Sequence, residues 1–270
     1  MTEPVLLSER IDGILVVTLN RPGKLNAMNL EMLSSLDGAI EEFRDSDALR
    51  VLLIRAKGRY FCAGADVLEG ETMNFERGSA IRLAHRRGIG GVQRMWDELE
   101  AIEKPVVVAH HAACVGGGLE MSLSCDFRLA AKSASYSFPE GVFGSLPASG
   151  GVSRLTRIIG AAWAKYLVMA NKPVDAERAL QIGLVHEVYP DDTFEDQTMA
   201  FCRHLAAQLP EAMGMAKLAI DLAQDVQAAQ GRNVERLANS ALLMGREFSE
   251  ALAKLRSRMA RGAAEAVPRD

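Results

Sequence analysis

The chain has 270 residues, of which 49% are hydrophobic and 24% are charged, and its formal net charge is −4 at pH 7. This composition excludes a disordered or low-complexity chain. The acidic balance argues against general binding to nucleic acids, so we expect no nucleic-acid partner. The length fits one large domain, or one domain with a smaller appendage.

The first half of the chain begins with a predicted hairpin. Apolar-rich runs at 5–10 and 14–19 flank Asp12-Gly13, a dipeptide that favours a tight turn. Asn29 then offers a helix N-cap, and the apolar residues after it recur at helical spacing: Leu30, Leu33, Leu36, Ile40 and Phe43. We therefore predict two strands followed by a helix.

Three further apolar runs, 51–54, 105–109 and 127–130, are short and continuous, which is typical of strands buried on both faces. Helical stretches separate them. This alternation of strands and helices predicts an α/β protein with parallel strand pairing and right-handed crossovers.

Beyond about Pro190 the pattern becomes helical. Residues 192–208, 211–229 and 233–262 are rich in Ala, Leu, Met, Glu and Arg and contain no strand-like run. We predict an α/β core over 1–190 that carries the sites. The helical segment over 191–270 is expected to serve oligomerisation and to cover the site.

Cysteine usage and the N-terminal sequence bear on the compartment. The four cysteines form neither a C-x-x-C pair nor a zinc-like spacing with histidine, which indicates a reducing compartment and no metal site. The N-terminus lacks the blocks of a secretory signal, and no stretch approaches the roughly 20 apolar residues of a membrane span. We expect a soluble, cytoplasmic protein without membrane contact.

Two glycine-marked loops follow predicted strands. Residues 58–66 contain Gly64, Ala65 and Asp66, and by themselves favour a tight connection over a ligand loop. Residues 114–120 place Gly116, Gly117 and Gly118 at the start of a helix, where free N–H groups make an anion or oxyanion site. Glycines that allow a helix to pack on a sheet are the alternative.

Two glutamates accompany the second loop. Glu120 lies three residues after Gly117, within the first helical turn, and Glu140 follows in Phe138-Pro139-Glu140. A lone glutamate is usually a solvated surface charge. Because Glu120 has apolar neighbours and Glu140 lies between proline and glycine, we interpret them instead as an acid/base pair.

At this point the sequence resembles the enoyl-CoA hydratase/isomerase (crotonase) superfamily over about residues 5–190. The two signature segments are 61–66 (FCAGAD) and 116–120 (GGGLE). The likeness continues, in order, through Arg21-Pro22, Asn26-Ala27, Cys125-Asp126, Phe138-Pro139-Glu140, Pro147, Gly150-Gly151, Arg154-Leu155 and the run from Ala179 to Val185. The resemblance implies a crotonase-like fold of repeated ββα units with C-terminal helices, assembled as a trimer or a dimer of trimers.

The resemblance also implies an enzyme of acyl-CoA and fatty-acid metabolism and assigns site residues. The N–H groups of Ala65 and Gly117 are expected to bind the oxygen of a thioester carbonyl. Glu120 and Glu140 match the paired glutamates of the hydratases. The CoA moiety is expected along Lys24, Leu25, Ala27, Ala63, Ala65, Asp66, Val67, Leu68 and Gly117.

The implied reaction is reversible hydration of 2-trans-enoyl-CoA to 3-hydroxyacyl-CoA, with no cofactor besides the CoA of the substrate. Glu120 is expected to activate water and Glu140 to deliver a proton to C2, or both residues to share these tasks. A double-bond isomerase using the same enolate, with Glu140 dominant, and a non-catalytic acyl-CoA binder are the alternatives.

Departures from the family pattern concern substrate choice more than membership. His110-His111-Ala112 replaces the usual turn before the glycines, Ala148 stands where many hydratases have glycine near the catalytic water, and segment 69–100 is longer than usual. We expect the long segment to shape the acyl pocket.

Overall fold

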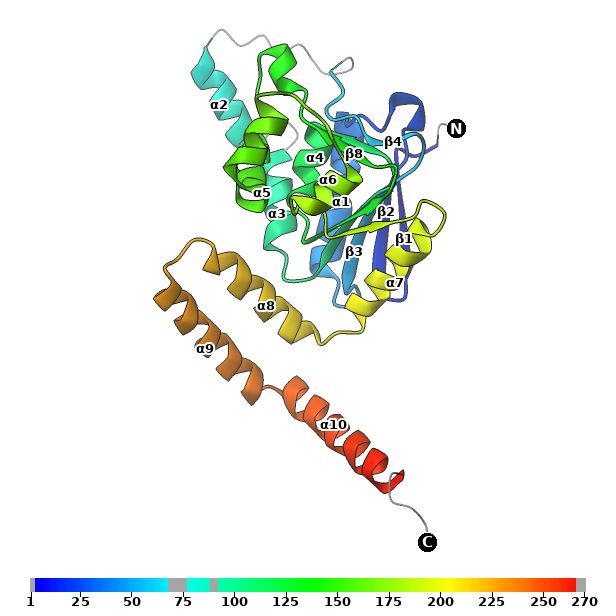
Figure 1. The fold of residues 1–270 in the computed structure, drawn as a ribbon, viewed down its shortest axis with the longest axis vertical. Helices are drawn as coiled ribbons and strands as arrows, with labels where there is room; N and C mark the ends of the chain where they lie inside the picture. Colours follow the sequence, from blue (N-terminus) through cyan, green and yellow to red (C-terminus); the bar gives the residue numbers. More distant parts are fainter. Residues whose placement is uncertain (1–2, 68–76, 88–91, 266–270) are drawn as a thin grey trace. The chain divides into compact units, whose positions relative to one another are not determined.

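The computed structural model describes residues 3–67, 77–87 and 92–265. The chain divides into two compact units, Met1–Ala207 and Gln208–Asp270. The first unit contains both β-sheets and all the candidate site residues, whereas the described secondary-structure elements of the second unit are all helices (Figure 1).

The larger sheet of the described residues has six strands. In spatial order they are β1 (Leu6–Ile11), β2 (Ile14–Leu19), β3 (Val51–Ala56), β5 (Val106–His110), β7 (Phe127–Ala131) and β10 (Glu187–Tyr189). The β1–β2 hairpin is antiparallel, and its turn residues Asp12 and Gly13 both adopt positive φ. All other neighbours in this sheet pair in parallel, which confirms the predicted α/β class.

A smaller sheet positions the site. Its strands, in spatial order, are β4 (Tyr60–Cys62), β6 (Ala113–Val115), β8 (Ser135–Ser137) and β9 (Val174–Asp175). β4, β6 and β8 run parallel, with Cys62 opposite Cys114 and Val115 opposite Ser137. Because parallel strands end at the same edge, the three segments that leave them are brought together there. These segments carry Ala65, Gly117 and Glu140.

The helices of the first unit connect these strands. They are η1 (Pro22–Lys24), α1 (Leu30–Asp45), α2 (Gly78–Arg87), α3 (Val92–Ala101), α4 (Gly117–Ser122), η2 (Glu140–Phe143), α5 (Gly151–Val168), α6 (Ala176–Gln181) and α7 (Phe194–Ala206). α1 begins as predicted, because the Asn29 side chain accepts a hydrogen bond from the Met32 amide at 3.0 Å.

Helices cover both faces of the larger sheet. Alternate residues of β2, such as Leu15 and Val17, belong to the same core as Leu36 of α1. On the other face, Leu53 of β3 and Phe194 of α7 line one small cavity. Every residue of β2 is therefore buried, as expected for a central strand covered on both sides.

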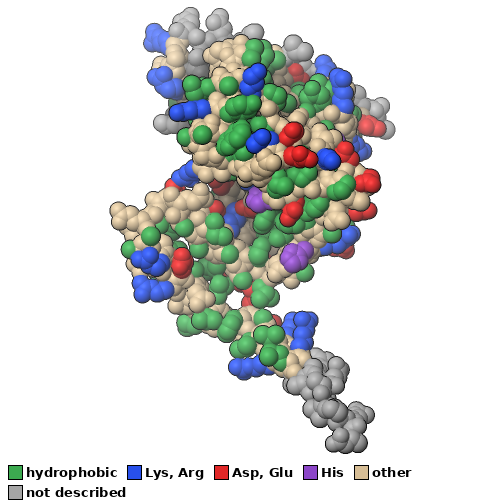
Figure 2. Space-filling model, in the orientation of Figure 1, with side chains coloured by type: hydrophobic (Ala, Val, Ile, Leu, Met, Phe, Trp, Pro, Cys, Tyr) green, Lys and Arg blue, Asp and Glu red, His purple; other side chains and the backbone are tan. Residues whose placement is uncertain are grey.

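The C-terminal unit consists of α8 (Pro210–Ala223), α9 (Ala228–Met244) and α10 (Arg246–Glu265), in which α9 packs against both α8 and α10. The sequence predicted a single helical stretch over 233–262, but Gly245 is extended and separates α9 from α10. Hydrophobic side chains of this unit are exposed on the face shown in Figure 2. Among the described residues, no helix combines the length and apolar character needed to cross a membrane.

Candidate active site

Two backbone amides converge where β4 and β6 end. A Cβ atom added to Gly117 would lie 3.5 Å from the Ala65 nitrogen, and one added to Gly64 would lie 3.3 Å from the Gly117 nitrogen. Neither Ala65 N–H nor Gly117 N–H donates to an acceptor among the described residues. Ala65 is exposed and Gly117 is half-buried, so a ligand oxygen can approach both N–H groups.

Glycine is required where α4 meets β4. Gly116, the N-cap residue of α4, has φ 53° and ψ −124°, a conformation that residues with a Cβ atom avoid. A Cβ atom on Gly118 would lie 2.6 Å from the Cβ atom of Cys62, so any side chain there would push the helix from the sheet. Close packing of the helix on the sheet therefore explains Gly118, while the oxyanion site at the helix N-terminus stays a prediction.

Glu120 lies in the first turn of α4 with only 7% of its surface exposed. Its Oε1 atom accepts hydrogen bonds from the amides of Ser149, at 2.7 Å, and Gly151, at 3.3 Å. The pKa of Glu120 is raised to about 7, mainly by burial and in part by the charge of Glu140, while the two amides oppose the rise. This carboxyl group is therefore poised to exchange a proton near neutral pH.

Glu140 begins η2, in the segment that leaves β8, and its side chain lies against Gly116. A Cβ atom added to Gly116 would lie 2.7 Å from Glu140 Oε1. The Oε2 atom is buried and has no hydrogen-bond partner among the described residues. Burial raises the pKa of Glu140. Because two nearby carboxyl groups resist double ionisation, the pair favours a state with one retained proton.

The segments expected to bind CoA lie side by side. Ala63 N–H donates to Leu25 O at 3.0 Å, and Met28 N–H donates to Gly64 O at 2.8 Å. Lys24 is exposed at the end of η1, while Leu25 and Ala27 are half-buried. The structure thus brings 24–28 and 63–67 together into one edge of the site.

Asp66 was expected to contact CoA, but its carboxylate already binds another residue of the protein. It forms an ion pair with Arg21 at 3.0 Å, and both side chains are at least nine-tenths buried. The next residue, Val67, is 81% exposed. Leu68 and two parts of the long segment 69–100 expected to shape the acyl pocket, 69–76 and 88–91, lie outside the described residues.

Two of the departures from the family pattern have clear positions. His110 is fully buried, with Nε2 at 2.9 Å from Ser122 Oγ and Nδ1 at 3.2 Å from the Tyr136 hydroxyl. Burial lowers the pKa of His110 to about 3, so this residue is a neutral part of the core. Ala148 is exposed, and its carbonyl oxygen accepts a hydrogen bond from Gln93 at 2.8 Å.

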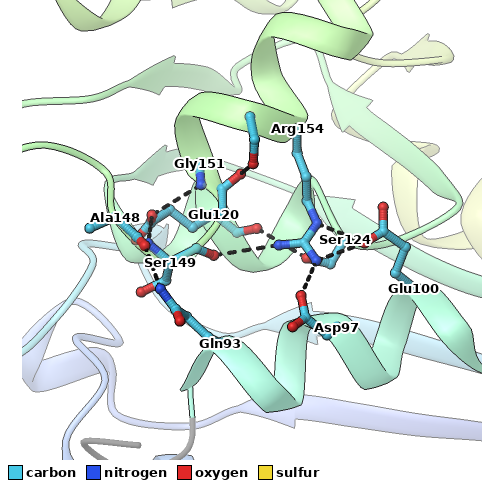
Figure 3. A network of polar contacts seen from close by, with 11 residues as sticks. Gln93, Asp97, Glu100, Glu120, Ser124, Ala148, Ser149, Gly151 and Arg154 are labelled. Atoms are coloured by element: carbon cyan, nitrogen blue, oxygen red, sulfur yellow. Dashed lines mark hydrogen bonds and ion pairs between the residues drawn. The ribbon is translucent and has the colours of Figure 1, made fainter. Parts of the chain in front are cut away.

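A polar network to which the sequence pattern assigns no role lies behind Glu120 (Figure 3). Arg154 of α5 contacts Asp97 and Glu100 of α3, and lies against the turn 149–151 that binds Glu120. In the sequence, the signal was the spacing of Asp97 and Glu100, which places two carboxylates on one face of a helix.

Comparison with known proteins identifies the family of this chain. The family model described as Enoyl-CoA hydratase/isomerase matches residues 9–256. The chain belongs to this family.

Curated relatives and solved structures agree with that membership. A short-chain-enoyl-CoA hydratase of Clostridium acetobutylicum is 35% identical over 80% of each chain. A 2,3-dehydroadipyl-CoA hydratase of Escherichia coli is 32% identical, with 86% of this chain and 87% of the relative covered. The crystal structure of an enoyl-CoA hydratase from Bacillus anthracis superposes with a TM-score of 0.86 at 28% identity, covering 94% and 96% of the two chains.

Membership in the enoyl-CoA hydratase/isomerase family confirms the predicted crotonase fold. It also makes this chain an enzyme of a family that acts on CoA thioesters. The edge formed by Ala65, Gly117, Glu120 and Glu140 gathers, in the described residues, two free amide donors, one buried carboxyl group and one half-buried carboxyl group. That combination suits chemistry in which negative charge develops on one oxygen while protons move nearby.

Proposed function

We propose that this enzyme catalyses the reversible addition of water to 2-trans-enoyl-CoA thioesters. The observation that carries the proposal is the placement of two carboxyl groups with raised pKa beside two unpartnered amides, at the N-terminal end of one helix. Hydration needs both the amide donors and the carboxyl groups, because the attack of water at C3 generates an enolate oxygen and then requires a proton at C2.

In the proposed mechanism, the N–H groups of Ala65 and Gly117 donate to the thioester oxygen as it becomes negative. Such donors contribute about 3 kcal/mol each to a transition state of this kind. The Lys24–Met28 and Ala63–Val67 segments hold the CoA portion, so that the reacting carbons lie beside both carboxyl groups.

The two glutamates divide the proton transfers. Both amide contacts to Glu120 Oε1 stabilise its ionised form, which leaves Oε2 to orient and deprotonate water. Glu140 has no donor to its buried Oε2 atom, so the neutral acid is favoured and delivers its proton to C2. Because the protons belong to the pair, either residue can take part in both steps. The reaction uses no cofactor beyond the substrate's own CoA.

Isomerisation of an enoyl-CoA double bond is the second candidate. One relative, 32% identical, is named an enoyl-CoA isomerase/hydratase. In that reaction Glu140 would dominate and Glu120 would be largely dispensable. A trimer or dimer of trimers and a cytoplasmic location remain part of this proposal.

A panel of enoyl-CoA thioesters of graded size tests the proposal. We expect loss of the conjugated-enoyl absorbance with at least one substrate and formation of the 3-hydroxyacyl product. Glu120→Gln and Glu140→Gln should each lower kcat by about 100-fold or more, the usual contribution of a general acid or base. Near-normal hydration by both variants contradicts the proposal, and a shifted double bond as product favours isomerisation.

A further inference from the structure

The candidate residue for a further role is Arg154, which lies directly behind the turn that binds Glu120. Its side chain is only 10% exposed although it carries a charge. On one side, its Nη2 atom lies 2.6 Å from Asp97 Oδ1 and 2.7 Å from Glu100 Oε2, and its Nε atom lies 3.0 Å from the same Glu100 oxygen. The guanidinium group is thus fixed to α3 from two positions (Figure 3).

On its other side, Arg154 packs against the turn. Nη1 donates to the Ser149 carbonyl at 3.5 Å, and a Cβ atom added to Gly150 would lie 2.0 Å from Nη1. A Cβ atom added to Gly151 would lie 2.8 Å from Glu120 Oε1. The Ser149–Gly151 backbone therefore lies between the guanidinium group and the carboxylate, and glycine is needed at both 150 and 151.

We propose that Arg154 is a positioning residue for catalysis, because it holds the Ser149 and Gly151 amides against Glu120 Oε1. This role rests on the function proposed above. Asp97 and Glu100 act one step further away by holding Arg154. Gln93 supports the same turn through the Ala148 carbonyl. The carboxylate that activates water would thus be oriented by a chain of contacts that reaches α3.

The charges around Glu120 make the consequence of losing Arg154 clear. Glu140 of η2 raises the pKa of Glu120, whereas Arg154 of α5 and the two turn amides lower it. Loss of the guanidinium group removes a favourable charge and releases the amides. Both effects raise the pKa of Glu120 and disorient its carboxylate, so kcat falls more than substrate affinity does.

The decisive experiment compares Arg154→Ala and Arg154→Lys with Arg128→Lys, a matched control in which another buried arginine binds only backbone carbonyls in the contacts described, those of Leu184 and Cys125. We expect Arg154→Ala to lose about tenfold or more in kcat, with KM changed less. The acidic limb of its kcat/KM profile should move to higher pH. Arg154→Lys, which keeps the charge, should recover part of both losses, and Arg128→Lys should shift neither.

Chemical rescue provides an independent measurement. A pocket of about 360 Å³ is lined by Asp97, Glu100, Ser149 and Arg154, so a small cation can reach the space that truncation leaves. Millimolar guanidinium chloride should restore activity to Arg154→Ala, whereas sodium chloride at equal ionic strength should not. If Arg154→Ala does not fold, Arg154→Lys and Glu100→Gln decide the question by their pH profiles.

Carbon-13 NMR of glutamate-labelled enzyme separates this proposal from the proposed function. The Glu120 carboxyl signal, assigned from its loss in Glu120→Gln, should titrate at higher pH in the Arg154 variants than in the wild type. An unchanged titration and pH profile in a folded Arg154→Ala variant overturns the positioning role, as does no change in both Arg154→Lys and Glu100→Gln where Arg154→Ala does not fold. A wild-type enzyme that leaves every enoyl-CoA unchanged overturns the proposed function, while the titration still tests Arg154.

Discussion

At Glu120, the catalytic role proposed above conflicts with stability. A carboxyl group with 7% exposure ionises only at a cost, and its pKa of about 7 compares with an ordinary value of 4.5. Between these pH values the folded chain binds more protons at Glu120 than the unfolded chain does. The free energy of unfolding therefore falls as pH rises through this range.

Glu120→Gln should consequently stabilise the protein at alkaline pH while it lowers kcat. The glutamine stays neutral and its Oε1 atom can still accept from Ser149 and Gly151. The gain in unfolding free energy should be near zero at pH 4 and approach about 3 kcal/mol above pH 8. Denaturant unfolding at several pH values measures it, with Glu41→Gln, an exposed glutamate on α1, as the control. A gain that is the same at every pH would contradict this explanation.

Gly116 allows a second test at the residue scale, because it places Glu140. Gly116→Ala adds an atom 2.7 Å from Glu140 Oε1 and imposes strain at positive φ. Gly160→Ala imposes strain at φ 75° but meets nothing within 4 Å, so it isolates the backbone cost. Both variants should lose about 1 to 3 kcal/mol of stability.

The two alanine variants should differ in activity. Gly116→Ala displaces the Glu140 carboxyl group, so it should lower kcat by about 100-fold, whereas Gly160→Ala should retain kcat. Steady-state kinetics at a temperature where both variants are folded makes the comparison. Equal kcat values for the two variants would show that Gly116 serves the backbone alone.

At the scale of elements, the Arg21–Asp66 pair joins the segment after β2 to the segment after β4. Arg21 also donates from Nη1 to the Ala27 carbonyl at 2.5 Å. Asp66→Asn leaves a buried guanidinium group without this counter-charge, so it should cost about 3 kcal/mol of unfolding free energy. It should also raise KM for CoA substrates, because both CoA segments loosen.

The control for this pair is Asp37→Asn, which removes an ion pair with the exposed Arg94. Exposed pairs of this kind contribute about 0 to 1 kcal/mol. Thermal unfolding and KM are measured for both variants. Similar effects from the two substitutions would contradict a structural role of the buried pair.

The larger sheet was predictable because its elements are long enough to carry a pattern. The hairpin turn, the Asn29 cap and the apolar runs of β3, β5 and β7 each combine two local signals. The smaller sheet was missed because β4, β6, β8 and β9 have only two or three residues each, too few for any periodicity. Those strands are held by pairing, which a local pattern does not reveal.

In the candidate site, too, some features were predictable from the sequence and others were not. Gly116–Gly118 and Glu120 lie on one local motif, and the sequence placed them at a helix start. The contact of Arg154 with the turn behind Glu120 depends on α3 and α5 approaching each other, so sequence spacing could not predict it. Likewise, nothing local indicated that the Asp66 carboxylate would be occupied by Arg21.

At the scale of the whole molecule, the C-terminal unit carries large apolar side chains that its own helices do not cover. Within that unit, Leu237 is 73% exposed and Met244 is 90% exposed, and further large apolar residues are open to solvent: Leu218, Ile220, Leu222, Leu243, Phe248, Leu255 and Met259. Exposed apolar surface of this extent indicates association. It agrees with the trimer or dimer of trimers proposed for this enzyme.

Sedimentation velocity tests that assembly directly. The wild-type enzyme should sediment as three or six copies of the 29.3 kDa chain. Leu237→Lys and Met244→Lys should shift it toward the monomer, since each would bury a charge at the interface. Gln224→Lys, in the turn after α8, adds the same charge without removing an apolar side chain and should leave the assembly intact. The side chains of Leu237 and Met244 are exposed in the single chain. Unchanged sedimentation of both variants would therefore mean that α9 does not mediate the assembly.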